Sequence, residues 1–246
     1  MTRDEDLHID VNGETVLLDK SGALYWPAER TLVFADLHFE KGSAFAHRGS
    51  LLPPYDTRTT IRRMREAIVR HAPARIIALG DSFHDGGAAE RLDEEERAGL
   101  SAMVAGAEWI WVEGNHDPEP PKWLGGRVAG EIALGGLLFR HLPGCGGQKG
   151  EVAGHLHPAT TVTRRGLSVR RRCFACDGAR LLLPAFGAYA GGLDIRDEAI
   201  ASLFAEAFAV YALGRERVYA VAGPVQPGRR KISDEIQPRS AARRTV

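Results

Sequence analysis

Four short fragments of the sequence carry side chains that can bind metal ions. Each offers carboxylate, amide or imidazole donors, without a thiolate, directly after an apolar stretch. The fragments are Asp36-Leu37-His38, Gly80-Asp81, Gly114-Asn115-His116-Asp117 and Gly154-His155-Leu156-His157. Oxygen and imidazole donors suit Mn²⁺, Fe or Zn²⁺ in a catalytic site better than they suit a closed structural zinc site. We therefore expect the four fragments to meet around metal.

The spacing within the fragments supports this expectation. Alternate residues of a strand face the same way, so Asp36 and His38 are expected to reach one metal ion together, as are His155 and His157. In three fragments a glycine precedes the first donor and permits the close backbone approach that crowded ligands need. Each fragment alone is a weak signal, since a single histidine on an apolar strand is more often part of the core. If the four fragments shared no function, several polar groups that are costly to bury would lie at the ends of buried strands by chance.

Three apolar segments end directly before or one residue before these fragments, and we expect them to be buried parallel strands. They are Thr31–Ala35, Arg75–Leu79 and Glu108–Val112. Helical spacing of apolar residues predicts helices over residues 57–71 and 90–105, which lie between the strands. Strands that alternate with helices indicate an α/β layer with ligand groups just beyond the carboxyl ends of its strands.

The sequence pattern changes after residue 136, where short apolar segments separated by turn residues predict a second, largely antiparallel sheet. Short strands are also expected over residues 8–34, with a hairpin turn at Asn12-Gly13. The remaining expected elements are strands at 137–140, 151–154, 160–163, 167–170, 180–183 and 218–221 and a helix at 197–210. We expect one domain over residues 1–226 and a mobile, basic tail over residues 227–246.

Composition and charge narrow the class of protein. Lys and Arg together number 32, as do Asp and Glu, so net charge argues neither for nor against an anionic partner. The acidic N-terminus does not resemble a secretory signal, and no run approaches the ~18 to 20 apolar residues of a membrane span. We therefore expect a cytoplasmic protein without a membrane partner. Cys173 and Cys176 form a C-x-x-C pair, for which ordinary strand cysteines are favoured over a zinc or redox role.

The four fragments, in this order, resemble the motifs of the calcineurin-like metallophosphoesterases: D-x-H, G-D, G-N-H-[DE], a later His, and G-H-x-H. The resemblance implies an α/β fold, a four-layer α-β-β-α sandwich of two mixed sheets. It also implies a dinuclear site in which Asp81 bridges. By resemblance one metal is held by Asp36, His38, Asp81 and His157, and the other by Asp81, Asn115, His141 and His155. His141 carries no distinctive motif of its own, and a core or surface histidine is the alternative there.

The resemblance implies hydrolysis without a serine or cysteine nucleophile. Two ions ~3.5 to 4 Å apart can share a water and lower its pKa, so that a metal-bridging hydroxide attacks the phosphorus atom. His116 is next to Asn115 but is not assigned to a metal, so we expect it to act as the acid for the leaving oxygen or as a donor to the transition state. Asp117 is expected to orient His116 or another histidine.

Three longer segments, residues 35–57, 79–85 and 183–193, resemble the bacterial ligase-associated DNA damage response endonucleases, the PdeM family. The resemblance implies a Mn²⁺-dependent phosphodiesterase that cleaves DNA in repair, with Fe or Zn²⁺ as alternative metals. It implies single-stranded or flexible DNA as substrate, and a DNA ligase, an exonuclease and a helicase as pathway partners; a homodimer is compatible with it. Gly-Asp-Ser-Phe-His-Asp at 80–85 departs from the G-D-x-x-D-R-G of protein phosphatases, which argues against a phosphoprotein substrate.

Substrate contacts are expected from the segment 39–56, which is too long and too broken by Gly and Pro for a simple connection. Its candidate phosphate contacts are Lys41, His47 and Arg48, and Phe45 and Tyr55 are its candidates for base stacking. His84 follows Asp81 closely enough to line the site. A basic cluster at 164–172 is either a nucleic-acid contact or only a solvated face. Two other functions stay open: a phosphoesterase for a nucleotide or similar metabolite, and a non-catalytic binding module.

Overall fold

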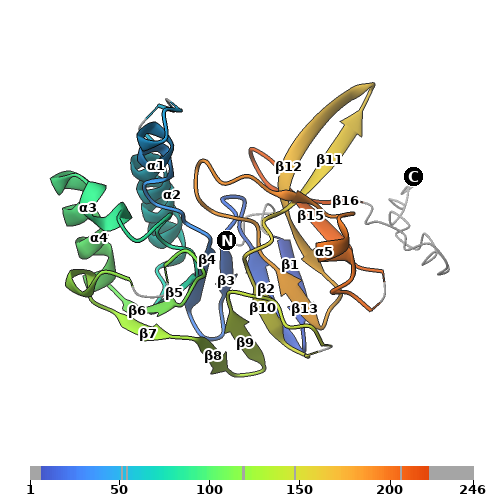
Figure 1. Ribbon diagram of the computed structural model, residues 1–246. Helices are drawn as coiled ribbons and strands as arrows, with labels where there is room; N and C mark the ends of the chain where they lie inside the picture. The colour runs from blue at the N-terminus through green and yellow to red at the C-terminus, as the bar shows by residue number, and fades with distance from the viewer. Residues whose placement is uncertain are drawn as a thin grey trace, which may run out of the picture.

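Two β-sheets face each other across a shared apolar core, and helices cover the outer face of the first sheet (Figure 1). The computed structural model describes residues 7–50, 52–53, 55–117, 120–146, 148–205 and 207–221. Among these residues, no helix has the length and apolar character needed to cross a membrane. The predicted basic tail, residues 227–246, lies outside the described part of the chain.

The first sheet has seven strands in chain order, which are antiparallel from β1 to β4 and parallel from β4 to β7. Its strands are β1 (Leu7–Val11), β2 (Glu14–Leu18), β3 (Leu24–Trp26), β4 (Thr31–Ala35), β5 (Arg75–Leu79), β6 (Glu108–Val112) and β7 (Arg127–Ala129). The predicted bounds of β4, β5 and β6 are confirmed. Successive residues of β4 point to opposite faces: Val33 packs in the core between the sheets, and Phe34 packs against the helices.

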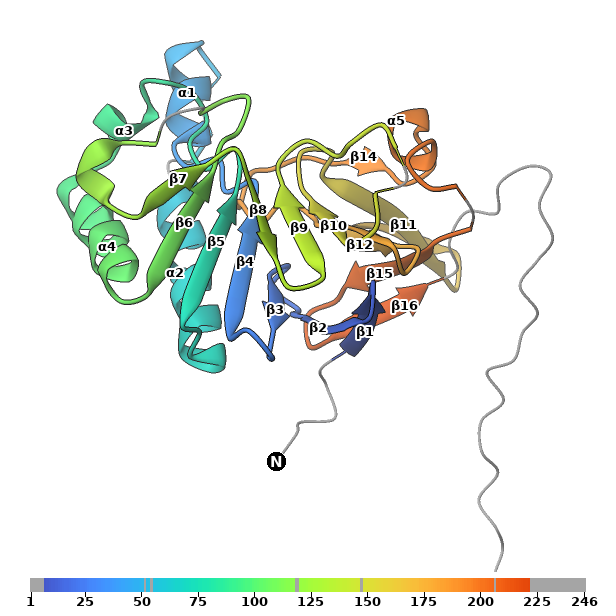
Figure 2. The same ribbon diagram turned by 90° about the horizontal axis from the view of Figure 1, so that it is seen from below.

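The helical layer lies on the side of β4 to β6 that faces away from the second sheet (Figure 2). Its helices are α1 (Lys41–His47), α2 (Asp56–His71), α3 (Ala88–Arg91) and α4 (Glu94–Ala105), with a short 3₁₀ turn, η1 (Lys122–Leu124). Ile61 and Met64 of α2 are buried against this face of the sheet, as the helical spacing predicts. The segment expected to be a long irregular connection contains α1.

The prediction of one helix over residues 90–105 was wrong, because the chain forms α3 and α4 instead. Asp93 stands between them in an extended conformation, and its side chain accepts a hydrogen bond from the backbone N–H of Glu96. The Glu96 carboxylate accepts from the Asp93 backbone N–H in return. This capping box starts a new helix at Glu94.

The second sheet is mixed, with the strand order β14-β11-β12-β13-β10-β9-β8; off this path, β15 pairs with β12, and β16 pairs with β15. Its strands are β8 (Glu131–Leu134), β9 (Leu137–Arg140), β10 (Glu151–Ala153), β11 (Pro158–Arg164), β12 (Leu167–Cys176), β13 (Arg180–Leu182), β14 (Leu193–Asp194), β15 (Ala209–Leu213) and β16 (Val218–Val221). β10 pairs in parallel with β9 and β13, and β11 with β14, while the other pairs are antiparallel. The two mixed sheets confirm the predicted fold class.

The prediction of a helix over residues 197–210 was also wrong. Asp197 caps a single turn, α5 (Glu198–Ala201), and the chain then forms β15. Val210 and Ala212 are two residues apart and both pack in the apolar cluster on the outer face of the second sheet. Strand pairing with β12 therefore prevails over the helical pattern.

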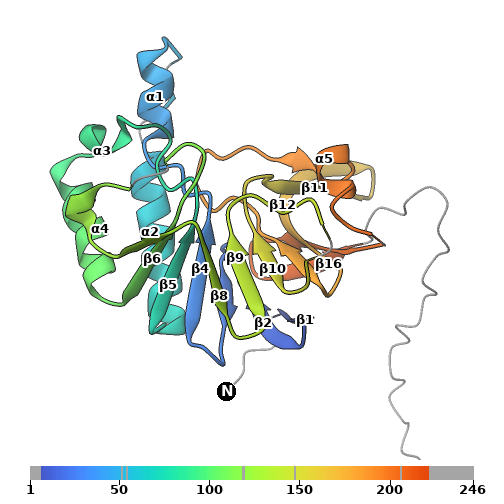
Figure 3. The same ribbon diagram turned by 60° about the horizontal axis from the view of Figure 1, so that its bottom comes forward.

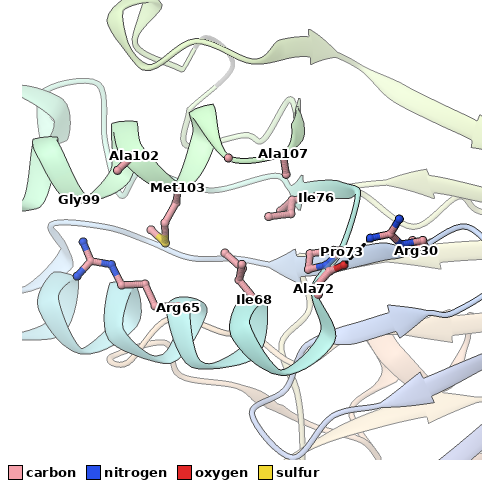
Figure 4. A pocket seen from close by; sticks show the side chains of 11 residues that line it. Arg30, Arg65, Ile68, Ala72, Pro73, Ile76, Gly99, Ala102, Met103 and Ala107 are labelled. Atoms are coloured by element: carbon pink, nitrogen blue, oxygen red, sulfur yellow. Dashed lines mark hydrogen bonds between the residues drawn. The ribbon is translucent and has the colours of Figure 1, made fainter.

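A pocket of about 500 Å³ separates α2 from α4 (Figure 4). Ile68 and Met103 line its walls, and Pro73 and Ile76 lie at the amino-terminal end of β5. The candidate metal ligands follow the carboxyl-terminal ends of the strands, and none of them lines this pocket. Figure 3 shows α1 and α3 beyond that carboxyl-terminal edge, while α2 and α4 run alongside the strands.

Candidate metal centre

The candidate ligands meet because the strands that carry them end at one level. The register pairs Ala35 with Leu79 and Leu79 with Val112, the last residues of β4, β5 and β6. In the second sheet, Arg140 of β9 pairs with Ala153 of β10, again the last residues. The loops that follow these strands therefore leave the sheets side by side.

One group of donors consists of Asp36, His38 and His157, whose ligand atoms all lie within 4.8 Å of one another. His157 Nε2 is 3.2 Å from Asp36 Oδ1 and 3.4 Å from His38 Nε2. Asp36 is fully buried and His38 is 5% exposed. Three donors from two sheets thus converge on one point.

The second group consists of Asp81, His141 and His155, which meet the same 4.8 Å criterion. His141 Nε2 lies 3.4 Å from Asp81 Oδ2 and 3.2 Å from His155 Nδ1. Asn115 Oδ1 lies 3.0 Å from His141 Nε2, which brings the amide to the same group. The structure thus places His141, the residue with the weakest sequence signal, among the donors.

Asp81 lies between the two groups. Its Oδ2 is 3.4 Å from His141 Nε2 and 4.0 Å from His38 Nε2, a histidine of the other group. Its Oδ1 accepts a hydrogen bond from the backbone N–H of His116. Although burial raises the pKa of Asp81, the hydrogen bond with His141 and its neighbours hold that pKa well below the usual range. Asp81 is therefore an ionised carboxylate placed to bridge.

The donor set fits two metal cations. Burial, together with the charge of His157, lowers the pKa of His38 to about 3, so its imidazole is neutral and has a lone pair to donate. In each group two histidine ring nitrogens face each other, at 3.4 Å in one and 3.2 Å in the other. Two imidazoles aimed at one point, beside a buried carboxylate, form the nitrogen and oxygen coordination that Mn²⁺, Fe and Zn²⁺ accept.

The ligand fragments are sharp turns rather than continued strands. Five of the candidate ligands have positive φ angles between 44° and 67°, although none is glycine: Asp36, His38, Asp81, His155 and His157. The expectation that strand alternation aligns Asp36 with His38 was therefore wrong, because β4 ends at Ala35. Such conformations are rare for these residues and persist where the surrounding structure imposes them.

Hydrogen bonds between the loops impose these conformations. The His38 N–H donates to the Asp81 carbonyl oxygen at 2.9 Å, and the Phe39 N–H donates to the Ser82 carbonyl oxygen at 2.8 Å. The His155 N–H donates to the Asp36 carboxylate at 3.0 Å. These hydrogen bonds thus fix the ligand loops relative to one another.

The glycines of the fragments permit close contacts, as the sequence predicts. A Cβ on Gly80 would lie 2.2 Å from His141 Nδ1, and one on Gly154 would lie 2.6 Å from Asp36 Oδ2. Gly187 was not recognised from the sequence as part of the site. A Cβ there would lie 2.2 Å from the Leu37 carbonyl oxygen, between two candidate ligands. The segment Phe186-Gly187-Ala188 therefore packs directly on the first ligand loop.

His116 lies at the open side of the two groups, with 41% of its side chain exposed. Its Nδ1 donates to the His84 carbonyl oxygen at 2.8 Å, and its Nε2 lies 4.0 Å from Asp81 Oδ2. Asp117 Oδ2 accepts a hydrogen bond from the backbone N–H of Phe83 at 2.8 Å. That Asp117 orients His116 or another histidine stays a prediction. Burial raises the pKa of Asp117 to about 7.

The expected phosphate contacts lie on one side of the site. The His84 ring stacks on His116, with centroids 5.4 Å apart, and packs near Phe45 of α1. Burial and the charge of Lys41 lower the pKa of His84, and Arg48 contributes to the same effect. Burial also lowers the pKa of Lys41 itself. A pocket of about 330 Å³ opens beside His116, with Phe83, Ala89 and Pro121 in its lining.

The basic cluster of β11 and β12 divides into two kinds of arginine. Arg172 is a structural residue, since its Nη1 donates to the carbonyl oxygens of Ala185, Phe186 and Gly187. The arginines at 164, 165, 170 and 171 are exposed.

The two cysteines of the C-x-x-C pair lie in different apolar clusters. Cys173 and Cys176 belong to clusters on opposite faces of the sheet, and both are free and buried. The favoured reading as ordinary strand cysteines is confirmed.

Known proteins are similar to this chain in sequence and in fold. Among solved structures, the chain is similar to a Pseudomonas putida nuclease MPE, with 29% sequence identity and a TM-score of 0.71 over 88% of this chain and 100% of that one. A phosphoesterase from E. coli, Yfce, aligns over 78% of this chain and 98% of its own with 16% identity and a TM-score of 0.41. No curated protein sequence matches significantly. The family model for calcineurin-like phosphoesterases matches residues 29–175, more than half of the chain, and the protein therefore belongs to that family.

Proposed function

We propose that this metallophosphoesterase is a phosphodiesterase that cleaves DNA. The observation that carries the proposal is the pair of donor groups joined by Asp81, with the exposed His116 beside them. Similarity to a solved nuclease favours DNA over a metabolite as substrate. The family and the two donor groups by themselves establish a hydrolase of phosphate esters.

Two divalent cations, for which we propose Mn²⁺, would be held by the residues of the two groups. Asp36, His38 and His157 would hold one and His141, His155 and Asn115 the other, with Asp81 shared between them. Bound there, the ions would supply an activated water and neutralise phosphoryl oxygens. The positive-φ turns and interlocked loops would keep the seven ligands in place without the ions, so little reorganisation accompanies binding.

His116 has the role of proton donor to the leaving oxygen. Its Nδ1–H is held by the His84 carbonyl, which fixes the ring and leaves Nε2 facing the site. An imidazole at this position can carry the proton that the departing alkoxide needs. Asp117 acts indirectly, because it accepts a hydrogen bond from the backbone N–H of Phe83. The next residue, His84, has the carbonyl oxygen that accepts from His116.

The cationic side of the site receives the phosphate. Lys41 starts α1 and is half-buried, and Arg48 ends the same helix in an exposed position. Their charges contribute to the lowered pKa of His84, which supports an assignment of all three to one side of the groups. We assign these residues to the phosphates that flank the scissile bond.

The decisive experiment offers the Mn²⁺-loaded protein three substrates: a circular single-stranded DNA, bis-p-nitrophenyl phosphate and p-nitrophenyl phosphate. We expect cleavage of the DNA and the bis-ester, and loss of both with a chelator or with Asp81→Asn. Hydrolysis of the mono-ester alone would overturn the proposal and favour the metabolite phosphoesterase. Circular DNA reports internal cleavage, because an enzyme that requires a free end leaves it intact.

The expected association with a DNA ligase, an exonuclease and a helicase stays a prediction, as does the cytoplasmic location. The association follows from the resemblance to endonucleases of DNA repair. Co-purification of tagged protein from a native host would test the association.

A further inference from the structure

The strands β11 and β12 extend past the body of the second sheet as a two-stranded hairpin, residues 160–171, which we call the arm (Figure 1). The pairing runs from Thr160 and Arg171 to Arg164 and Leu167, where a two-residue turn closes it. Every residue from 163 to 171 is exposed. The arm therefore adds little to the core, and its composition calls for another explanation.

The arm is strongly cationic. It holds four arginines, and no acidic residue occurs between positions 152 and 176 of the sequence. Arg170 is held by the Gly192 carbonyl oxygen and lies 3.9 Å from Asp194. Within the described ranges, Arg164, Arg165 and Arg171 make no ion pair. Three guanidinium groups are thus free for an anionic partner.

The turn of the arm gives no conformational reason for an arginine. Arg165 and Gly166 have φ angles of 51° and 77°. A two-residue hairpin turn with positive φ at both positions favours Asn-Gly. Arginine occupies a position where the backbone favours asparagine, so its charge at the tip is the feature that requires a function.

Apolar side chains share one face of the arm with the arginines. Leu167 is 76% exposed and Val169 is 44% exposed. Strand alternation and the register place both on the same face as Arg164 and Arg171. Guanidinium groups suit phosphates, and exposed apolar side chains suit the faces of unpaired bases. A duplex keeps its bases stacked inside and would offer this face only phosphates.

The arm also has a defined reach. β11 begins directly after the candidate ligand His157 and runs from Pro158 to Arg164. At ~3.3 Å per residue, its tip lies about 20 Å from His157 along the strand. At the ~3.4 Å rise of a stacked strand, that distance corresponds to roughly six nucleotides.

We propose that the arm binds the single-stranded part of the DNA substrate, roughly six nucleotides from the bond that is cleaved. Arg164, Arg165 and Arg171 bind its phosphates, and Leu167 and Val169 pack against its bases. This inference rests on the proposed nuclease function and adds to it a second, non-catalytic binding site. Substrates too short to reach the arm gain nothing from it.

The test uses the double variant Arg164→Thr with Arg165→Asn. Threonine suits a strand and Asn-Gly suits the turn, so the hairpin keeps its fold while two charges are lost. The control variant, Arg62→Ala with Arg65→Ala, removes two exposed charges from α2. KM and kcat are measured with single-stranded oligonucleotides of about 4 to about 20 nucleotides and with bis-p-nitrophenyl phosphate, at several salt concentrations.

Each phosphate contact to a single strand changes the slope of log affinity against log salt by about 0.7 and contributes about fivefold at ~0.1 M salt. The arm variant is expected to raise KM for long oligonucleotides roughly 25-fold, to reduce the salt slope by about 1.4 and to leave kcat unchanged. KM for the bis-ester and for the shortest oligonucleotides stays at the wild-type value. Leu167→Ser raises KM for long oligonucleotides without changing the salt slope.

The outcomes separate the two proposals. If the wild type hydrolyses the bis-ester but no DNA, the nuclease function fails. If the wild type cleaves DNA and the arm variant behaves like the α2 control, the arm is not a binding site. Equal loss on duplex and single-stranded substrates would refute single-stranded DNA as the occupant. Thermal unfolding of both variants verifies that they are folded.

Discussion

The contact of Gly187 with the first ligand loop leads to a sharp prediction for Gly187→Ala. The new Cβ would lie 2.2 Å from the Leu37 carbonyl oxygen and 3.1 Å from that of Asp36, whereas Cβ atoms rarely come within 3.0 Å of another atom. Both obstacles are backbone atoms, so no rotamer change relieves the contact. One of the two segments must move by about 0.8 Å, close to the ~1 Å misplacement that can cost 10²-fold in rate.

The expected result is a loss of roughly 100-fold in kcat/KM for bis-p-nitrophenyl phosphate. Leu37 lies between Asp36 and His38, so its displacement moves two of the three donors of the first group. We therefore also expect weaker Mn²⁺ binding, measured by calorimetric titration of the metal-free protein.

Gly191→Ala is the matched control for this prediction. Gly191 lies four residues further along the same segment, has no atom within 4 Å of an added Cβ and has no positive φ. This variant should keep wild-type activity and Mn²⁺ affinity. If Gly187→Ala retains activity and Mn²⁺ affinity within a fewfold of wild type, the segment does not position the ligands. A cooperative thermal transition in both variants ensures that the comparison is between folded proteins.

Three further predictions concern catalysis and stability. His116→Ala should keep its metal content, measured by mass spectrometry, and lose ~10² to 10⁴-fold in kcat; full activity would refute its role. Burial raises the pKa of Asp19, but hydrogen bonds with His71 and Ser21 hold it well below the usual range. The ionised Asp19 carboxylate contributes fully to the free energy of unfolding above about pH 4, and this contribution is lost as pH falls toward the lowered pKa. Asp19→Asn should therefore lower the free energy of unfolding, measured with urea, by ~3 kcal/mol at neutral pH and by less in acid. Arg172→Ala should lower Tm without changing the salt dependence of DNA cleavage, unlike the arm variant.

The central strands could be predicted to the residue because burial and chemistry agree there. β4, β5 and β6 are apolar on both faces, and each ends one or a few residues before a polar fragment. The same coincidence locates the candidate ligands, since polar groups at the ends of buried strands need a reason to be there. His141 follows β9 in the same way, but a single histidine after a short strand gave too little pattern to stand alone.

The two wrong helix predictions arose where two local sequence signals conflicted. Asp93 and Glu96 have the spacing of a capping box, which breaks the helix expected over residues 90–105. Apolar residues at Phe208, Val210 and Ala212 have the period of a strand, but they follow a capped turn that begins like a helix. Both signals are visible in the sequence; the local cap decided the first case, and strand pairing with β12 decided the second.

Other features depend on contacts between residues far apart in the chain. Gly187 packs on Leu37, and Arg172 holds the carbonyl of Gly187 in place. Nothing in the local pattern distinguishes Arg172 from the exposed Arg171 beside it. The strained turns of the ligands likewise arise from loop-to-loop hydrogen bonds that no single segment contains.

The positive φ angles of the candidate ligands have a consequence for protein engineering. Glycine or asparagine at such positions relieves conformational strain, so a library sorted for heat resistance alone should enrich these residues at Asp36, His38, Asp81, His155 and His157. Each such substitution would relieve strain in its turn and remove a candidate metal ligand. Thermostable descendants of this enzyme should therefore be selected on turnover as well as on melting, because stability alone rewards the loss of its chemistry.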